Sequence, residues 1–252
     1  MKFRPGITGL LLAGLLWPCF AGAEESGVRQ DARAVDVLQK MSAYNESLDR
    51  LTIESVSLTD ARLGGGLMVT NTTEVKVSID RPGSAHISSF DGVSTKELYF
   101  HDGLFSVFNS GTGYYAQAEI PKDLDAAMEF VMEDLDVEAP LMDLMYRDAS
   151  KHLIGSQETI MYLTDKARVA GVDCHQIVIR GPESDVQLWV QEGDLPLLRK
   201  LIITSKWEGG APRFVANLKW KPNPDFSDKE FEFKAPEGSI NIGFQGRQEG
   251  GE

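Results

Sequence analysis

The sequence predicts a mainly β fold with helices, in which one large, curved antiparallel sheet carries helices packed on its open side. Many short segments alternate apolar and polar residues, as half-buried strands do. Turn-forming residues such as Arg81-Pro82-Gly83 separate consecutive segments closely enough for antiparallel pairing. Helical periodicity occurs at the start of the chain and again near its middle. A closed barrel or a sandwich is the alternative, which the amphipathic helices disfavour because each needs an apolar surface to cover.

The first helix and the first group of strands follow directly from the spacing of apolar residues. Ala34, Val37, Leu38 and Met41 recur at helical spacing, which predicts a helix over residues 32–47. From Leu51 the period changes to two, and antiparallel neighbours are expected across each short turn. The predicted strands of this half are Leu51 to Arg62, Leu67 to Ile79, Ala85 to Phe90, Glu97 to His101, Leu104 to Phe108 and Tyr114 to Ile120.

A helical insertion then interrupts the strands. Pro121 ends the last strand, and an apolar stripe follows at helical spacing beside acidic residues. Pro140 marks the start of a second predicted helix, so the insertion is a two-helix lid. The remaining predicted strands are Thr159 to Leu163, Val172 to Arg180, Val186 to Gln191, Leu198 to Trp207, Phe214 to Lys221, Glu230 to Lys234 and Ile240 to Phe244.

The N-terminal residues indicate an exported protein, and the charge of the chain excludes one class of partner. Lys2 and Arg4 precede an apolar run, and Ala21-Gly22-Ala23 forms a small-residue cleavage site, so residues 1–23 are expected to be a signal peptide. Residues 24–252 then form a single periplasmic domain. Loss of the signal takes the formal charge from −13 to −15, which repels phosphate backbones, so nucleic acid is not expected as a partner. No later apolar run reaches the roughly 20 residues of a membrane span.

The residue types needed for catalysis or metal binding are present but are not grouped. The four histidines are isolated in the sequence, and no second His or Cys stands at zinc-site spacing, so no metal and no other cofactor is expected. Cys174 is the one cysteine outside the signal and is expected to be a small core residue without a disulfide. No nucleophile elbow, phosphate loop or dinucleotide fingerprint occurs. The chain is therefore not expected to be an enzyme.

The methionines of the predicted lid are the most suggestive feature for function. Unbranched, polarizable methionine side chains adapt to irregular or variable apolar partners. They are interpreted either as ordinary core or as one wall of a cavity for a hydrophobic ligand, because a curved sheet capped by helices leaves room between its layers. The candidate ligand-binding residues are Leu124, Met128 and Met132 on the first lid helix and Leu141 and Met145 on the second.

Beyond residue 170 the sequence resembles a family of bacterial periplasmic proteins of unknown function. Gly171-Val172-Asp173-Cys174-His175 and Gln187-Leu188-Trp189 carry the resemblance first. Further matches are Gly193, Pro196, Arg199-Lys200, Ile203-Thr204, Gly210-Ala211-Pro212-Arg213-Phe214, Ala216, Trp220, Phe231-Glu232-Phe233 and Pro236-Glu237-Gly238. The family is placed with the LolA-like and LolB-like lipoprotein carriers. The resemblance implies an unclosed β-barrel of about eleven strands with a helical lid, whose concave apolar face receives acyl chains in the transport members.

The sequence leaves two functions open. The first is a soluble periplasmic binding module that shields a hydrophobic ligand, such as a lipid or the acyl chains of a lipoprotein, between sheet and lid. The second is a structural or protein-interaction module of the cell envelope, whose cavity is filled by its own side chains. In that case an exposed strand edge or the acidic helices would bind an envelope protein.

Overall fold

The computed structural model describes residues 30–149, 160–207, 209–227 and 229–244. The predicted signal peptide and its cleavage site lie outside these residues. The helices are α1 (Ala32–Glu46), α2 (Leu124–Glu133) and two 3-10 turns, η1 (Gly64–Gly66) and η2 (Met142–Leu144). The strands are β1 (Arg50–Arg62), β2 (Met68–Asp80), β3 (Ser84–Phe90), β4 (Thr95–His101), β5 (Leu104–Asn109), β6 (Tyr114–Glu119), β7 (Ile160–Val169), β8 (Val172–Arg180), β9 (Ser184–Gln191), β10 (Leu198–Ser205), β11 (Arg213–Pro222) and β12 (Ile240–Asn241).

All the described strands belong to one twelve-stranded sheet made of two meanders. Its order is β12-β6-β5-β4-β3-β2-β1-β11-β10-β9-β8-β7. The pairing of β1 with β11, from Leu51 opposite Pro222 to Thr59 opposite Phe214, joins the meander β1–β6 to the meander β7–β11. Every pair is antiparallel except the short contact of β12 with β6. The predicted unclosed antiparallel sheet is therefore confirmed.

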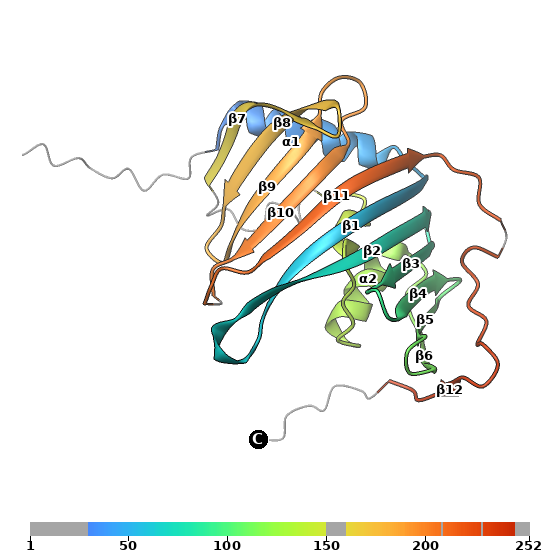
Figure 1. Cartoon of the computed structure of the whole chain (residues 1–252). Coiled ribbons are helices and arrows are strands. Elements are labelled where there is room, and N and C mark those ends of the chain that lie inside the picture. The colour runs from blue at the N-terminus through green and yellow to red at the C-terminus, as the bar shows by residue number, and fades with distance from the viewer. Residues whose placement is uncertain (1–29, 150–159, 208, 228, 245–252) are drawn as a thin grey trace, which may run out of the picture.

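Alternation along the strands gives the sheet two different faces. On β1, Leu51 and Ile53 are buried on the inner face, whereas Glu54 and Val56 on β1 are exposed. Both helices lie on the inner face (Figure 1), and their apolar sides join the inner residues of both meanders in one hydrophobic core. The inner face of the sheet is thus covered rather than open.

Helix α1 forms as the sequence predicts. Asp31 is its N-cap, and its carboxylate accepts hydrogen bonds from the backbone N–H of Arg33 at 2.9 Å and from the Arg33 guanidinium. The guanidinium bond lowers the pKa of Asp31 to about 2. Ala34, Leu38 and Met41 are buried against the sheet, so the predicted apolar stripe is the packed face of the helix.

The segment between β6 and β7 connects strands at or near opposite edges of the sheet, and its described residues lie on the inner face. Residues 120–149, here called the lid segment, are the described part of this connection. The first predicted lid helix is present as α2. The second is only the 3-10 turn η2, because Leu141 has a left-handed backbone with φ of 65°, which interrupts a helix begun at Pro140.

The C-terminal segment differs from the predicted strands. Residues 230–234 form no strand, because they run across the outer face of a sheet whose strands already have neighbours on both sides (Figure 1). Glu230 accepts hydrogen bonds from Lys76 and Ser78, each at 3.0 Å, and Phe233 packs against Tyr99 and Tyr115. The predicted strand Ile240 to Phe244 shortens to the two residues of β12. Side-chain contacts, rather than a strand ladder, hold this segment.

Cys174 is a free, buried cysteine, as expected, and burial raises its thiol pKa. Its side chain lies outside the main hydrophobic core. Within the described residues, no helix is both long and apolar enough to cross a bilayer.

Two positions on β1 provide a direct test of the two faces. Ile53 is fully buried and Val56 is 51% exposed. Ile53→Ala should lower the free energy of unfolding by about 2–5 kcal/mol, because it leaves a cavity in the core. Val56→Ala should change it by less than about 0.5 kcal/mol. Urea denaturation of both variants measures the difference, and equal losses would mean that the faces are assigned wrongly.

Candidate functional site

The five predicted ligand-binding residues lie together on the inner face of the lid segment. Leu124, Met128, Leu141 and Met145 are buried in the main hydrophobic core, and Met132 packs against its edge. They share this core with inner-face residues from both meanders, among them Ile87 of β3, Phe100 of β4 and Leu188 of β9. The structure therefore brings these residues together between lid segment and sheet, and their contact with a ligand stays a prediction.

Described side chains of the lid segment and of the sheet share one hydrophobic core. A cavity of about 10 Å³, no more than one water molecule needs, lies between α1, the lid segment and the β9–β10 loop. Met41, Leu144, Leu198 and Trp220 are among the residues that line it. In this arrangement the sheet and the lid segment are packed directly on each other.

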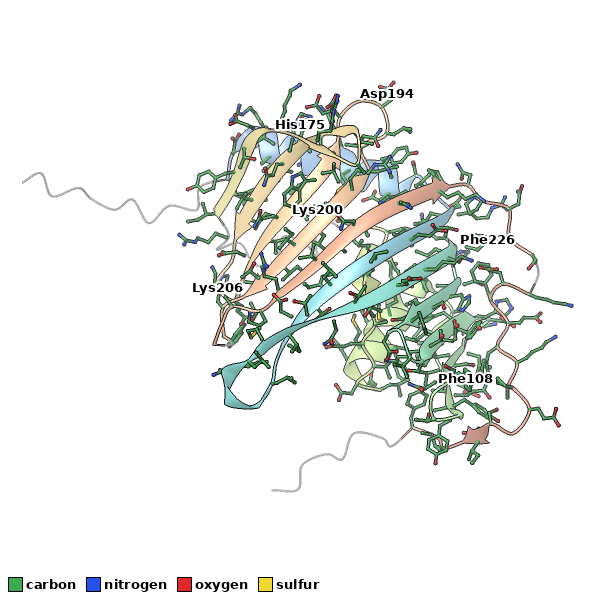
Figure 2. All side chains as sticks on the ribbon, viewed as in Figure 1. Phe108, His175, Asp194, Lys200, Lys206 and Phe226 are labelled. Carbon is green, nitrogen blue, oxygen red and sulfur yellow. The ribbon has the colours of Figure 1, made fainter. Side chains whose placement is uncertain are left out.

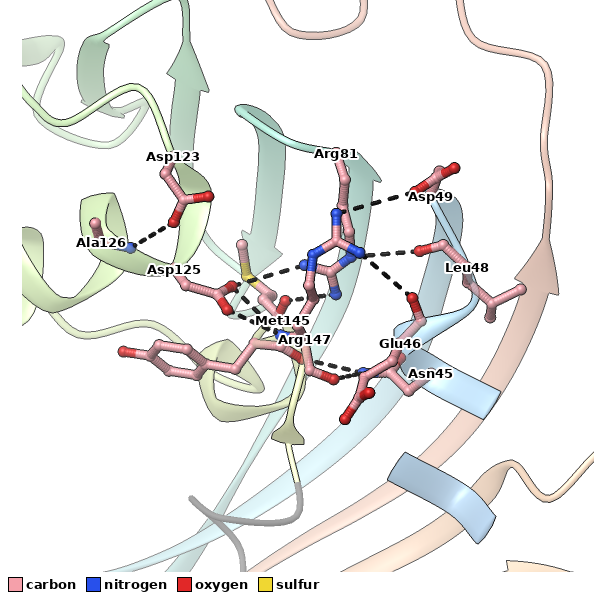
Figure 3. A network of polar contacts seen from close by, with 11 residues as sticks. Asn45, Glu46, Leu48, Asp49, Arg81, Asp123, Asp125, Ala126, Met145 and Arg147 are labelled. Carbon is pink, nitrogen blue, oxygen red and sulfur yellow. Dashed lines mark hydrogen bonds and ion pairs between the residues drawn. The ribbon is translucent and has the colours of Figure 1, made fainter. Parts of the chain in front are cut away.

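A buried arginine binds the lid segment through a hydrogen bond and an ion pair at one end of the sheet (Figure 3). Arg81 follows β2, and its side chain is only 1% exposed. Its Nη2 donates a hydrogen bond to the carbonyl oxygen of Met145 at 2.8 Å, and its Nε donates to that of Leu48 at 3.3 Å. Its Nη1 lies 3.7 Å from the carboxylate of Asp125 on α2. One guanidinium thus links the β2–β3 turn to three other segments.

Burial lowers the pKa of Arg81, and the nearby Asp125 carboxylate opposes this change. An arginine begins from so high a pKa that it stays protonated. A buried cation without partners is costly, and here two carbonyl oxygens and one carboxylate supply them. The guanidinium therefore favours the closed position of the lid segment.

The end of α1 holds the same stretch of the lid segment. The Asn45 side-chain amide donates hydrogen bonds to the carbonyl oxygens of Tyr146 and Arg147 at 3.0 and 3.2 Å. The hydroxyl of Ser42 donates to Asp148 at 2.7 Å. The backbone N–H of Arg147 in turn lies 3.3 Å from both carboxylate oxygens of Asp125. We call Arg81, Asn45, Asp125, Arg147 and their partners the latch network.

The sequence did not reveal the latch network. Its members come from four segments separated by many residues, and hydrophobic periodicity reports only which face of an element is buried. A charged residue directly before a turn proline, such as Arg81, also occurs in many exposed turns. The only available signal would have been that Arg81 follows three core positions of β2, Val75, Val77 and Ile79.

The outer face of the sheet also contains a groove, of about 690 Å³. Val56 and Phe90 contribute apolar side chains, and Val172, beside the β7–β8 turn, contributes another. Charged residues from neighbouring strands, including Glu54, Lys76, Arg199 and Lys219, also line the groove. None of the five predicted ligand-binding residues lines it.

Each described histidine contacts a different polar side chain. The Nε2 of His86 lies 2.6 Å from Glu97, His101 contacts Ser84, and the Nδ1 of His175 lies 3.8 Å from Glu192. The fourth, His152, is outside the described residues. Over the described part of the chain, no group of three His, Cys, Asp or Glu side chains is placed to hold a metal.

Removal of the Arg81 guanidinium tests whether the latch network contributes to stability. Arg81→Met should lower the free energy of unfolding by about 1–3 kcal/mol, because two buried carbonyl groups lose their donor. The control is Arg168→Met, which removes the exposed ion pair with Asp173 and should leave the urea midpoint unchanged. An unchanged midpoint for Arg81→Met as well would show that the network does not hold the lid segment.

Several solved structures align with most of this chain at low sequence identity. LprF from Mycobacterium bovis is 10% identical with a TM-score of 0.48, covering 81% of this chain and all of its own. The lipoprotein LppX of Mycobacterium tuberculosis is 10% identical with a TM-score of 0.45, covering 79% of this chain and all of its own. A LolA superfamily protein from Nitrosomonas europaea is 10% identical with a TM-score of 0.37, covering 79% of this chain and 97% of its own. Similarity this distant says nothing about what the present chain binds.

The sequence itself matches a family model. No curated protein matches the chain. The family model described as a predicted periplasmic protein, DUF2092, matches residues 34–245. This match agrees with the periplasmic family and location expected from the sequence. Because it covers most of the chain, the protein belongs to the DUF2092 family of predicted periplasmic proteins.

Proposed function

We propose that this protein is a periplasmic binding module that shields a hydrophobic ligand, a lipid or the acyl chain of a lipoprotein, between its sheet and its lid segment. The observation that carries the proposal is the contrast between the two kinds of contact that hold the lid segment. Its inner side meets the sheet through Leu124, Met128, Leu141 and Met145, all buried and apolar. Its polar contacts with Arg81 and Asn45 belong to the latch network at one end of the sheet.

A segment held by apolar packing on one side and by polar contacts at one end is suited to making room for a ligand. Methionine side chains have several rotatable bonds and pack against partners of variable shape. An acyl chain can replace them against the same apolar surface at little cost in buried area. The latch contacts join polar groups, which water can solvate when the lid segment moves. The lid segment can therefore move away from the sheet and cover a ligand that takes the place of these side chains on the apolar surface.

Arg81 supplies a chemical preference at the end of this surface. When the lid segment leaves, the guanidinium loses Met145 and Asp125 as partners. A phosphate or carboxylate on the ligand would replace them with a charge-assisted, bidentate pair. The proposed ligand therefore has an apolar chain and an anionic head group.

A second function is favoured by a different observation. Described side chains of the lid segment are buried in one core with those of the sheet, and the cavity between α1, the lid segment and the β9–β10 loop holds only about 10 Å³. A structural or protein-interaction module with a self-filled interior would have the same feature. The two functions differ in whether the wild-type protein takes up an acyl chain at all.

Titration with fluorescent acyl probes of increasing length tests the first function. Affinity should rise with chain length, because each buried methylene contributes about 0.8 kcal/mol before ordering costs. Met128→Asp should abolish binding, since it places a charge on the apolar surface, whereas Glu129→Gln on the exposed side of α2 should not change it.

A photoreactive acyl probe keeps the test independent of folding defects in Met128→Asp. In the wild-type protein, crosslinks should form on the lid segment at Met128, Met132 or Met145. Crosslinks confined to Val56 and Phe90 would place the ligand in the outer groove instead. Absence of wild-type binding at every chain length would favour the interaction module.

A further inference from the structure

Two loops at one end of the sheet expose three large apolar side chains. Leu63 and Leu67 flank the glycine turn of the β1–β2 hairpin and are 51% and 61% exposed. Trp207 follows β10 and is 70% exposed. We call these three residues the hairpin tip. Large apolar side chains in such positions contribute nothing to the core, so their exposure needs another explanation.

Glycines in the β10–β11 turn allow the two loops to approach each other closely. A Cβ on Gly209 would lie 2.8 Å from the Arg62 guanidinium, and one on Gly210 would lie 3.3 Å from the Met68 sulfur. Gly210 also has a φ of 98°, which side-chain-bearing residues rarely adopt. Close approach of the β10–β11 turn to the hairpin therefore brings Trp207 to the same end of the molecule as the two leucines.

The hairpin tip projects beyond the rest of the sheet. Pairing of β2 with β3 ends at Glu74, and pairing of β1 with β11 ends at Thr59. From there the hairpin continues to Arg62 and Met68, paired only with itself. Figure 1 shows the β1–β2 hairpin extending past the neighbouring strands, with the β10–β11 turn beside it. The tip is thus a protrusion rather than a groove.

Four charged side chains near the tip form ion pairs with each other. Asp60 accepts a hydrogen bond from the Thr70 hydroxyl at 2.7 Å and lies 3.6 Å from the Arg213 guanidinium. Lys206, labelled in Figure 2, pairs with Asp185 at 2.6 Å. The whole chain carries a formal charge of −13, which anionic lipid head groups repel. Because the acidic side chains Asp60 and Asp185 are paired with cations, they repel such head groups less than unpaired carboxylates would.

We propose that the hairpin tip docks the protein on a lipid bilayer surface, with Leu63, Leu67 and Trp207 inserted between the lipid head groups. Tryptophan and leucine are suited to this interface, where an aromatic ring with one polar atom is favoured. A stable protein–protein interface buries about 1,200 Å² or more and needs a complementary surface. Three side chains on a protrusion provide neither, whereas each side chain inserted into a bilayer contributes separately.

Docking on a bilayer goes beyond the proposed function and does not depend on it. The hairpin tip is at the end of the sheet opposite the β2–β3 turn that carries Arg81, because β2 runs from Met68 at the tip to Asp80 beside Arg81. Loss of the tip should therefore leave acyl-chain binding in solution intact.

Co-sedimentation with vesicles of phosphatidylethanolamine and phosphatidylglycerol tests the docking. The triple variant Leu63→Ser, Leu67→Ser, Trp207→Ser should bind these vesicles on the order of tenfold more weakly than the wild type. The control is Val93→Ser in the β3–β4 turn, which removes an apolar side chain that is 91% exposed and should leave vesicle binding unchanged. Brominated lipids should quench wild-type fluorescence, and Trp207→Phe should remove that quenching.

Two results would overturn the proposal. One is a wild-type protein that does not bind the vesicles, which would leave a protein partner as the occupant of the tip. The other is a triple variant that binds as tightly as Val93→Ser. The triple variant should keep the wild-type affinity for acyl probes in solution, so a failure of docking is distinguishable from a failure of ligand binding.

Discussion

The pairing of β1 with β11 is the constraint on which the rest of the molecule depends. It joins two meanders into one sheet and thereby places β7 at one edge and β6, beside the short β12, near the other. The described part of the chain between those strands lies on the inner face, where residues of α2 and η2 are buried in the core. An antiparallel sheet with one apolar face needs such a cover, because the exposed face would otherwise aggregate. Connectivity together with the apolar residues of the lid segment therefore makes it a cover for this face.

The latch network makes the position of this cover specific. Apolar packing is non-directional and would tolerate several placements of α2 on the sheet. A buried guanidinium does not tolerate several placements. The free energy lost when it leaves water is compensated only where its hydrogen-bond and ion-pair partners have the correct geometry. Arg81 has such partners in the carbonyl oxygens of Met145 and Leu48 and the carboxylate of Asp125. From α1, the Asn45 side chain adds a further directional hydrogen bond to the lid segment. Specific polar contacts at one end thus determine how an adaptable apolar interface closes.

The sequence predicts the strands, the first helix and the inner face well, because these depend on local period and on turn residues. Cys174 and Met128 are buried as their patterns indicate. Residues 230–234 have a strand-like pattern but lie across an occupied sheet, where side chains such as Phe233 find partners on the outer face. The latch network and the outer groove are equally invisible in the sequence. They arise where distant segments meet, and periodicity carries no information about which segments meet.

Hydrogen exchange of the lid segment, measured by mass spectrometry with and without a bound acyl probe, tests the central claim most directly. If the ligand takes the place of the lid side chains on the inner face, the backbone amides of residues 142–149 should exchange faster when the probe is bound, because they leave the latch network. Amides of β1 and β11 should keep their protection, since the joint between the meanders does not change. Equal exchange of the lid segment in both states, with the probe shown to be bound, would contradict this account.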